Sequence, residues 1–92
     1  MIRSFADNET ERVFRTGQSR RFGVVARMAA RRLLAIDFAH AVEDLRQPPG
    51  NRLEMLRGDR DGLWSNRIND QFRVCFRWDG QDAWDVEIVD YH

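Results

Sequence analysis

The chain has 92 residues, 42% apolar and 33% charged, with three Trp and six Phe. This length predicts a single domain over residues 1–92 with one modest core. The sequence has no apolar run long enough to cross a membrane and no secretory signal pattern, so we expect a cytoplasmic protein. A single cysteine, Cys75, excludes an internal disulfide and a cysteine-based metal cluster.

The net charge of zero hides a division along the chain. Residues 1–36 hold eight Arg and three acids, a charge of +5, and residues 37–92 hold seven Arg and twelve acids, a charge of −5. Between residues 12 and 36 there are seven Arg and no acid. This asymmetry fits nucleic-acid contact, and it equally fits a solvated helix face. Every basic residue is Arg, which holds its proton, so carboxylates, Tyr91, Cys75 and the two histidines remain for proton transfer.

The N-terminal half predicts a short strand followed by two helices. Residues 2–5 are a strand candidate, and residues 8–16 predict a helix with a capping box at its start and Gly17 as its stop. From about residue 23, apolar residues recur at helical spacing and predict a second helix that ends between His40 and Asp44. We interpret His40 as structural, since a cation is favoured at a helix end.

After Gly50 the apolar period changes to two. Four strands are predicted, at residues 53–57, 63–68, 72–78 and 84–89, with turns between them. The order β-α-α-β-β-β-β predicts an α+β domain in which an antiparallel sheet carries both helices on one face. The side chains expected on the helix-covered side are Trp64, Ile68, Phe72, Val74, Phe76, Trp78, Trp84, Val86 and Ile88.

Three arginines alternate with these apolar residues and should point to the open side of the sheet. Arg67, Arg73 and Arg77 could form a phosphate surface there, because guanidinium groups bind phosphate oxygens in pairs. The alternative is cross-strand pairing with Asp85 and Glu87.

The chain ends on Asp90-Tyr91-His92, which is its richest group of proton-transfer side chains. RNA cleavage without metal needs a base for the 2′-OH, an acid for the leaving oxygen and cations for the transition state. A polar chain end is the plain alternative. Strand alternation puts Tyr91 outside with Arg73 and puts Asp90 and His92 inside, so a site containing all three needs a bulge or turn near residue 90. No glycine-rich phosphate loop or metal-ligand spacing is present, so we expect no cofactor and no metal.

Five segments of the chain are recognisable, at residues 1–5, 48–54, 56–60, 67–76 and 86–92. Together they resemble the HigB toxins, also called the plasmid-maintenance killer family, of the RelE/ParE superfamily, and especially their GraT-type members. The resemblance covers essentially the whole chain. It implies a compact α+β microbial RNase fold, and an mRNA interferase that cuts translated messages in the ribosomal A site. It also implies a helix-turn-helix antitoxin of the HigA type, usually encoded just downstream, whose complex with the toxin represses their operon.

By the same resemblance, Arg73 would grip the scissile phosphate, and Asp90, Tyr91 and His92 would transfer protons and orient the substrate. Arg57 stands where relatives often have Lys. Glu54 stands where some have a catalytic His, and its carboxylate would repel the phosphate unless it acts as a base. With Arg67, these two residues complete the predicted substrate site.

Two further expectations follow from the resemblance. The side chain of Asn66 replaces an apolar residue and should have a hydrogen-bonding partner or be partly exposed. Four arginines, Arg20, Arg21, Arg27 and Arg31, are predicted to contact ribosomal RNA.

Two other functions remain open. A ParE-like chain on this fold would poison DNA gyrase without catalysis, and it would need no acid–base cluster. A weakly active toxin could serve mainly as the antitoxin's partner in repressing operator DNA, which the toxin would contact only through the complex.

Overall fold

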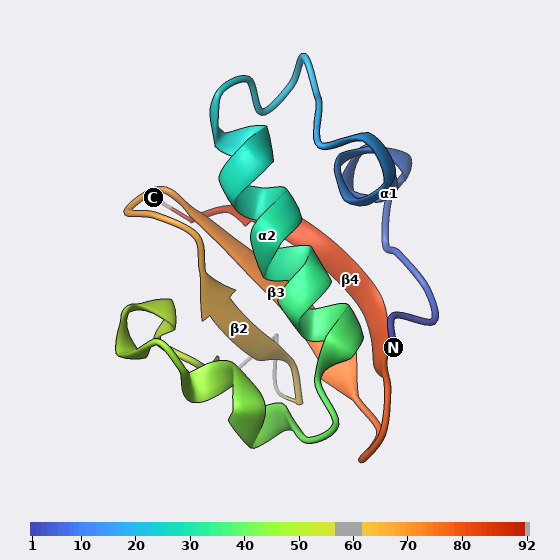
Figure 1. Ribbon diagram of the computed structural model, residues 1–92, viewed down its shortest axis with the longest axis vertical. Coiled ribbons are helices and arrows are strands. Elements are labelled where there is room, and N and C mark those ends of the chain that lie inside the picture. The colour runs from blue at the N-terminus through green and yellow to red at the C-terminus, as the bar shows by residue number, and fades with distance from the viewer. Residues whose placement is uncertain (57–61, 92) are drawn as a thin grey trace.

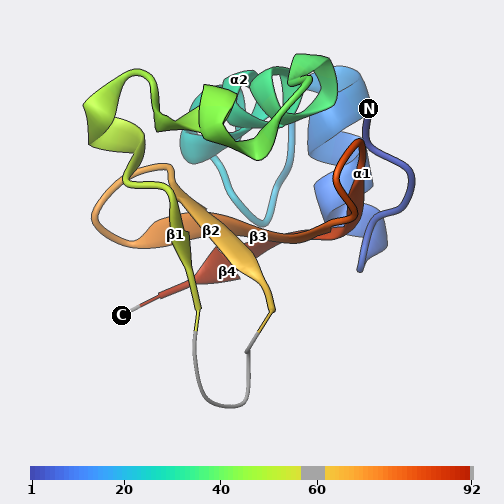
Figure 2. The same cartoon turned by 90° about the horizontal axis from the view of Figure 1, so that it is seen from below.

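The computed structural model describes residues 1–56 and 62–91. The strands form one antiparallel sheet in sequence order, and Figure 2 shows both helices over the same face of it. This confirms the predicted α+β arrangement (Figure 1). The elements are helices α1 (Asn8–Thr16) and α2 (Val25–Phe38), 3₁₀ turns at Val42–Arg46 and Pro49–Asn51, and strands β1 (Glu54–Met55), β2 (Trp64–Arg67), β3 (Phe72–Trp78) and β4 (Ala83–Asp90).

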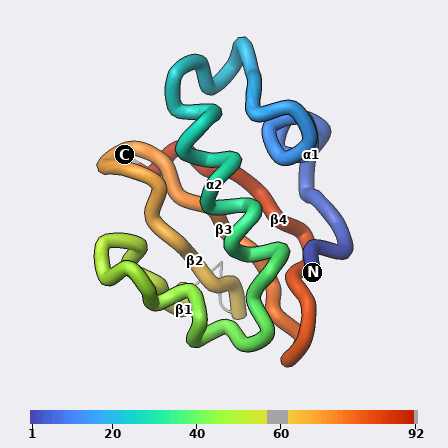
Figure 3. The backbone as a smooth tube through the Cα atoms, in the orientation of Figure 1, coloured from blue at the N-terminus to red at the C-terminus, as the bar shows by residue number. Residues whose placement is uncertain are grey.

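The predicted N-terminal strand is wrong. Residues 2–5 instead make two isolated parallel bridges to β4, Ile2 with Ala83 and Phe5 with Val86. Asp85 of β4 lies between the two bridged residues and has a φ of 54°. Figure 3 shows the N-terminal segment running beside β4, where it covers the edge of the sheet.

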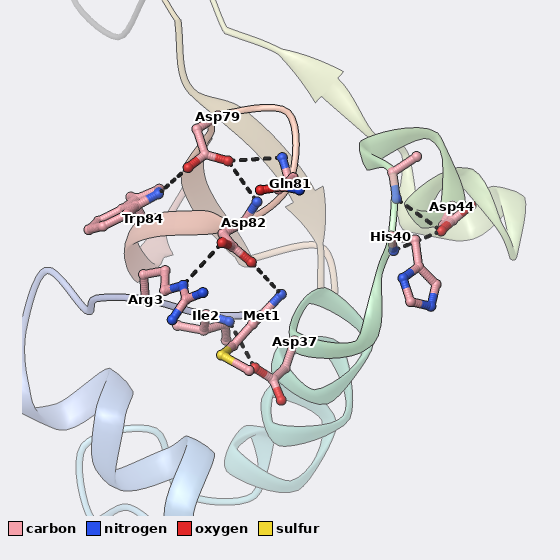
Figure 4. A network of polar contacts seen from close by, with 11 residues as sticks. Met1, Ile2, Arg3, Asp37, His40, Asp44, Asp79, Gln81, Asp82 and Trp84 are labelled. Atoms are coloured by element: carbon pink, nitrogen blue, oxygen red, sulfur yellow. Dashed lines mark hydrogen bonds and ion pairs between the residues drawn. The ribbon is translucent and has the colours of Figure 1, made fainter.

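A polar network fixes the N-terminal segment to the β3–β4 turn (Figure 4). The Asp82 carboxylate lies 3.0 Å from Arg3 Nε and 3.2 Å from the Met1 nitrogen. Asp79 accepts hydrogen bonds from the Asp82 and Gln81 backbones and from the Trp84 indole. These donors, the Asp82 backbone first, lower the pKa of Asp79 to about 2, so the turn keeps its negative charge well into acid.

The helices lie close to their predicted ranges and differ at their ends. Helix α1 ends at Thr16, with Gly17 at a φ of 71°, as predicted. Its N-cap is Asp7, which accepts from Thr10 N at 2.6 Å, rather than the predicted capping box. Helix α2 stops at Phe38, before its predicted end between His40 and Asp44. Beyond it, the Asp44 carboxylate accepts hydrogen bonds from the backbone N–H groups of His40 and Ala41 where a 3₁₀ turn begins.

The core lies between the helices and the inner face of the sheet, and one prediction for it is wrong. Between Cys75 and Arg77 the register of β3 against β4 shifts by one residue. This bulge reverses the alternation of β4, so Ala83 is buried and Trp84 is 41% exposed, contrary to its predicted inward place. The fully buried apolar side chains are Val13, Ala29, Leu33, Ile36, Val74, Phe76, Ala83 and Val86.

Candidate active site

Arg73 is the buried arginine of the outer face of the sheet. It lies on β3 opposite Arg67, with its side chain directed away from the helices, yet it is only 8% exposed. Its Nε donates to the buried Ser65 hydroxyl, and its Nη2 donates to the Arg52 carbonyl at 2.8 Å. Two neutral acceptors therefore fix the orientation of the guanidinium, which suits it to hold an anion in one geometry.

Glu54 already offers Arg73 an anion. Glu54 Oε1 lies 3.2 Å from Arg73 Nη2, and the Glu54 side chain is 55% exposed. The carboxylate comes from β1, which pairs Glu54 with Ser65 and so places both on the outer face. Glu54 and an incoming phosphate would compete for the same nitrogen.

The end of β4 brings Tyr91 to Arg73. The Arg73 guanidinium carbon lies 5.6 Å from the centroid of the Tyr91 ring, a cation–π distance, so Tyr91 is on the outer side as alternation predicted. Pairing stays regular to Asp90, opposite Phe72, and Tyr91 N continues it with a 2.6 Å bond to Gln71 O. The bulge that would gather the terminal residues is thus not near residue 90, since the bulge of β4 lies at residues 85–86.

Asp90 takes a different position from Tyr91. Its Oδ2 accepts from the Gln71 side chain at 3.3 Å, beside the β2–β3 turn. His92 and Arg57 lie outside the described residues. Of the predicted catalytic residues, the structure therefore brings Arg73 and Tyr91 into direct contact and places Asp90 at the same end of the sheet.

The other two arginines of the outer face have acidic partners of their own. Arg67 pairs with Asp70, and Arg77 Nε lies 3.4 Å from Asp85 Oδ2. The cross-strand interpretation is thus confirmed for one pair, and the phosphate surface stays a prediction. The cross-strand pair with Asp85 forms at Arg77, while Arg73 is the guanidinium held deep in the face.

Sequence reasoning missed the three groups that position this site. Strand alternation puts Ser65 on the opposite face of β2 from its neighbours Trp64 and Asn66. This pattern could have predicted that Ser65 shares the outer face with Arg73. The Arg52 carbonyl gave no signal, because it is a backbone group presented by a residue with a φ of 47°. Arg32 donates to the Arg67 carbonyl at 3.0 Å, and burial, followed by the charge of Arg67, lowers its pKa.

Asn66 has the partner that was predicted. It is 1% exposed, and its Nδ2 donates to the Leu45 carbonyl at 3.3 Å. The Asn66 amide links β2 to the first 3₁₀ turn, so this polar side chain on the inner face helps to hold the fold together.

The predicted RNA-contact arginines are all exposed and lie on the α1–α2 connector and on α2. Arg20 borders a hollow of about 420 Å³ that Arg12 also lines, and Arg21 stacks on the Phe22 ring at 5.2 Å. Phe22 in turn packs edge-on against Phe72, the neighbour of Arg73 in β3, at 5.7 Å. The basic connector is therefore anchored at the end of the sheet that carries Arg73 and Tyr91.

The described residues hold no group of three or more His, Cys, Asp or Glu placed to bind a metal. Among the same residues, no helix is both long and apolar enough to span a bilayer.

The fold and the site define a small α+β domain with a preset cation for an anionic ligand. Residues 3–92 match the family of RelE-like HigB toxins of type II toxin–antitoxin systems. The chain is 34% identical to "Endoribonuclease HigB" of Proteus vulgaris over the whole of both chains. It is 50% identical over 48 residues to "Toxin HigB-1" of Vibrio cholerae, a match that spans about half of each chain.

The chain belongs to the HigB-like toxins of type II toxin–antitoxin systems, and it is homologous over its full length to an endoribonuclease. A type II toxin has a cognate antitoxin as its partner.

Proposed function

We propose that this toxin is an endoribonuclease of the RelE-like microbial RNase fold, a single domain that cuts translated mRNA on the ribosome in the cytoplasm. The observation that carries the proposal is the guanidinium of Arg73, held by Ser65 and Arg52 and flanked by the Tyr91 phenol. A fixed cation of this kind would bind the scissile phosphate and stabilise the extra negative charge of the transition state.

Proton transfer would come from the end of β4. The chemistry needs a base for the 2′-OH and an acid for the 5′-oxygen, and Asp90, Tyr91 and His92 supply groups able to fill these roles without a metal. Arg67 and Arg57 would bind neighbouring phosphates. Arg57 keeps the positive charge of a Lys, but it cannot exchange a proton near neutral pH.

Docking on ribosomal RNA would use the exposed arginines of the connector and α2, namely Arg20, Arg21, Arg27 and Arg31. Dispersed guanidiniums on the connector and on α2 suit phosphate contacts along folded RNA. The antitoxin would be a helix-turn-helix protein of the HigA type, and the toxin would reach operator DNA only through that complex.

The Glu54–Arg73 ion pair favours one second candidate. If the carboxylate holds Arg73 against a phosphate, the toxin cuts slowly and acts mainly as the antitoxin's partner in repression.

The test is cleavage of a defined mRNA by the purified toxin, with and without programmed ribosomes. We expect cleavage only with ribosomes, and a loss of about 100-fold or more in Arg73→Ala, because removing one preorganised transition-state donor costs about 10²–10³. A matched control is Arg46→Ala, an exposed arginine away from the site. No cleavage under either condition would refute the nuclease, and full activity in Arg73→Ala would refute the site.

A further inference from the structure

The outward side of α2 is unusual for an exposed helix. Seven residues, one just before α2 and six within it, are exposed. At 3.6 residues per turn they fall within about a third of the helix circumference. We call them the outer face of α2. The opposite side carries the buried Ala26, Ala29, Leu33 and Ile36. The outer face consists of Val24, Arg27, Met28, Arg31, Leu34, Ala35 and Phe38.

Five of these seven side chains are apolar. Val24 is 94% exposed, Phe38 74%, Leu34 46% and Met28 43%. A helix on the surface of a small domain normally turns charged and polar residues to water. A contiguous exposed apolar patch instead marks a site of interaction. Figure 1 shows α2 in front of the sheet, and the buried residues of the helix lie on the side opposite to the outer face.

The charges of the face define what would cover it. Arg27 and Arg31 are its only charged residues, and no acid occurs between residues 12 and 36. The best complement is an amphipathic protein segment with apolar side chains and flanking carboxylates. The 14 residues of α2 extend about 21 Å, the length of three to four turns of a partner helix.

We propose that the outer face of α2 binds the cognate antitoxin through an acidic amphipathic segment. The type II class supplies a protein partner whose surface on this chain is unassigned, and this face offers both the apolar area and the charge to receive it. RNA is a weaker candidate, because the apolar side chains would gain little against phosphates.

One consequence rests on the proposed function. Arg27 and Arg31 are two of the four arginines assigned to ribosomal RNA, so a bound antitoxin would cover them. Arg73 lies on the outer face of the sheet, on the side away from α2, and would stay open. On this basis, antitoxin and ribosome would compete for the same side of α2.

The test measures affinity between the purified toxin and the antitoxin encoded beside its gene, by isothermal titration. One variant carries Leu34→Ala with Phe38→Ala, and a second carries Arg27→Glu with Arg31→Glu. Trp84→Ala is the control, since Trp84 is also exposed but lies on the strand side. Circular dichroism and thermal unfolding verify that each variant folds.

We expect the Kd for the antitoxin to rise about tenfold or more in each double variant, because truncating a central interface residue commonly costs that much affinity. In the control, Kd should rise less than twofold. The charge reversal keeps the proposal testable if the apolar variant folds poorly. An unchanged Kd in a folded double variant overturns the proposal. The proposal is also overturned if a double variant keeps its antitoxin affinity but loses self-association or ribosome binding. A second copy of the chain or RNA would then be the partner that covers the outer face of α2. Affinity is measured without any RNA cleavage. A result that refutes the proposed nuclease activity can therefore be told apart from one that refutes antitoxin binding at this face.

Discussion

Arg73 has its charge balanced before any substrate arrives. A guanidinium at 8% exposure is costly to bury without partners, and it has the Ser65 hydroxyl, the Arg52 carbonyl and the Glu54 carboxylate. The first two are neutral and orient the cation. Only the third is an anion, and it is half exposed, so it can leave. A scissile phosphate that replaced Glu54 would restore the charge balance with the same geometry.

Glu54→Gln should therefore speed cleavage. Removing a negative charge about 4 Å from the phosphate relieves roughly 1 kcal/mol of repulsion even at the dielectric of water, or about fivefold. We expect kcat/KM for mRNA on programmed ribosomes to rise by about this factor, mainly through KM.

Asp85→Asn is the control, since that carboxylate pairs with Arg77 outside the site. A clear fall in kcat for Glu54→Gln would contradict the competition. It would show instead that the carboxylate takes part in proton transfer.

At the scale of the elements, the edge of β4 is closed by three different acceptors. Ala83 N donates to Met1 O at 2.9 Å and Val86 N to Ser4 O at 3.1 Å. Ile88 N, further along the edge, donates to the Thr10 hydroxyl of α1 at 3.0 Å. A helix side chain thus replaces a missing strand and ties α1 to the part of β4 that leads to Tyr91.

Thr10→Val should destabilise the domain through this bond. Thr10 is fully buried, and valine keeps its shape but leaves Ile88 N–H without an acceptor, at a cost of about 1–3 kcal/mol. For a domain of this size, where 1 kcal/mol shifts Tm by about 4–8 °C, we expect Tm to fall by roughly 4–24 °C in thermal unfolding. Thr10→Ser keeps the hydroxyl and should lose less. A Thr10→Val protein as stable as Thr10→Ser would show that the bond contributes little.

The elements also show what alternation could and could not predict. Strand β3 was found because its apolar period is regular, and the end of helix α1 was found because Gly17 stops it. Trp84 was misplaced because a bulge depends on the backbone at Asp85, which has no signature in the apolar pattern. The same alternation correctly put Tyr91 beside Arg73, since β4 is regular after the bulge. The depth of Arg73 could not be predicted, because the Arg52 carbonyl that holds it is a backbone group brought close only by folding.

The whole molecule separates its charges along its length. Arg20, Arg21 and Arg27 lie on the α1–α2 connector and at the start of α2, whereas Asp79 lies in the β3–β4 turn, which is at the other end of the molecule in Figure 1. The ring contact between Phe22 and Phe72 keeps the basic end next to the strand that holds Arg73. A zero net charge therefore gives a directional field, which would turn the active site toward RNA as the toxin approaches.

This arrangement predicts a specific salt dependence of ribosome binding. Each phosphate contact releases counterions and adds about 0.7–0.9 to the slope of log K against log salt, so replacing all four of Arg20, Arg21, Arg27 and Arg31 by Gln should lower the slope by about 3. Filter binding to ribosomes between about 50 and 200 mM salt measures it. Arg46→Gln with Arg77→Gln removes positive charge elsewhere and should leave the slope nearly unchanged. If both sets lower the slope equally per charge, net charge rather than a defined docking surface controls the encounter.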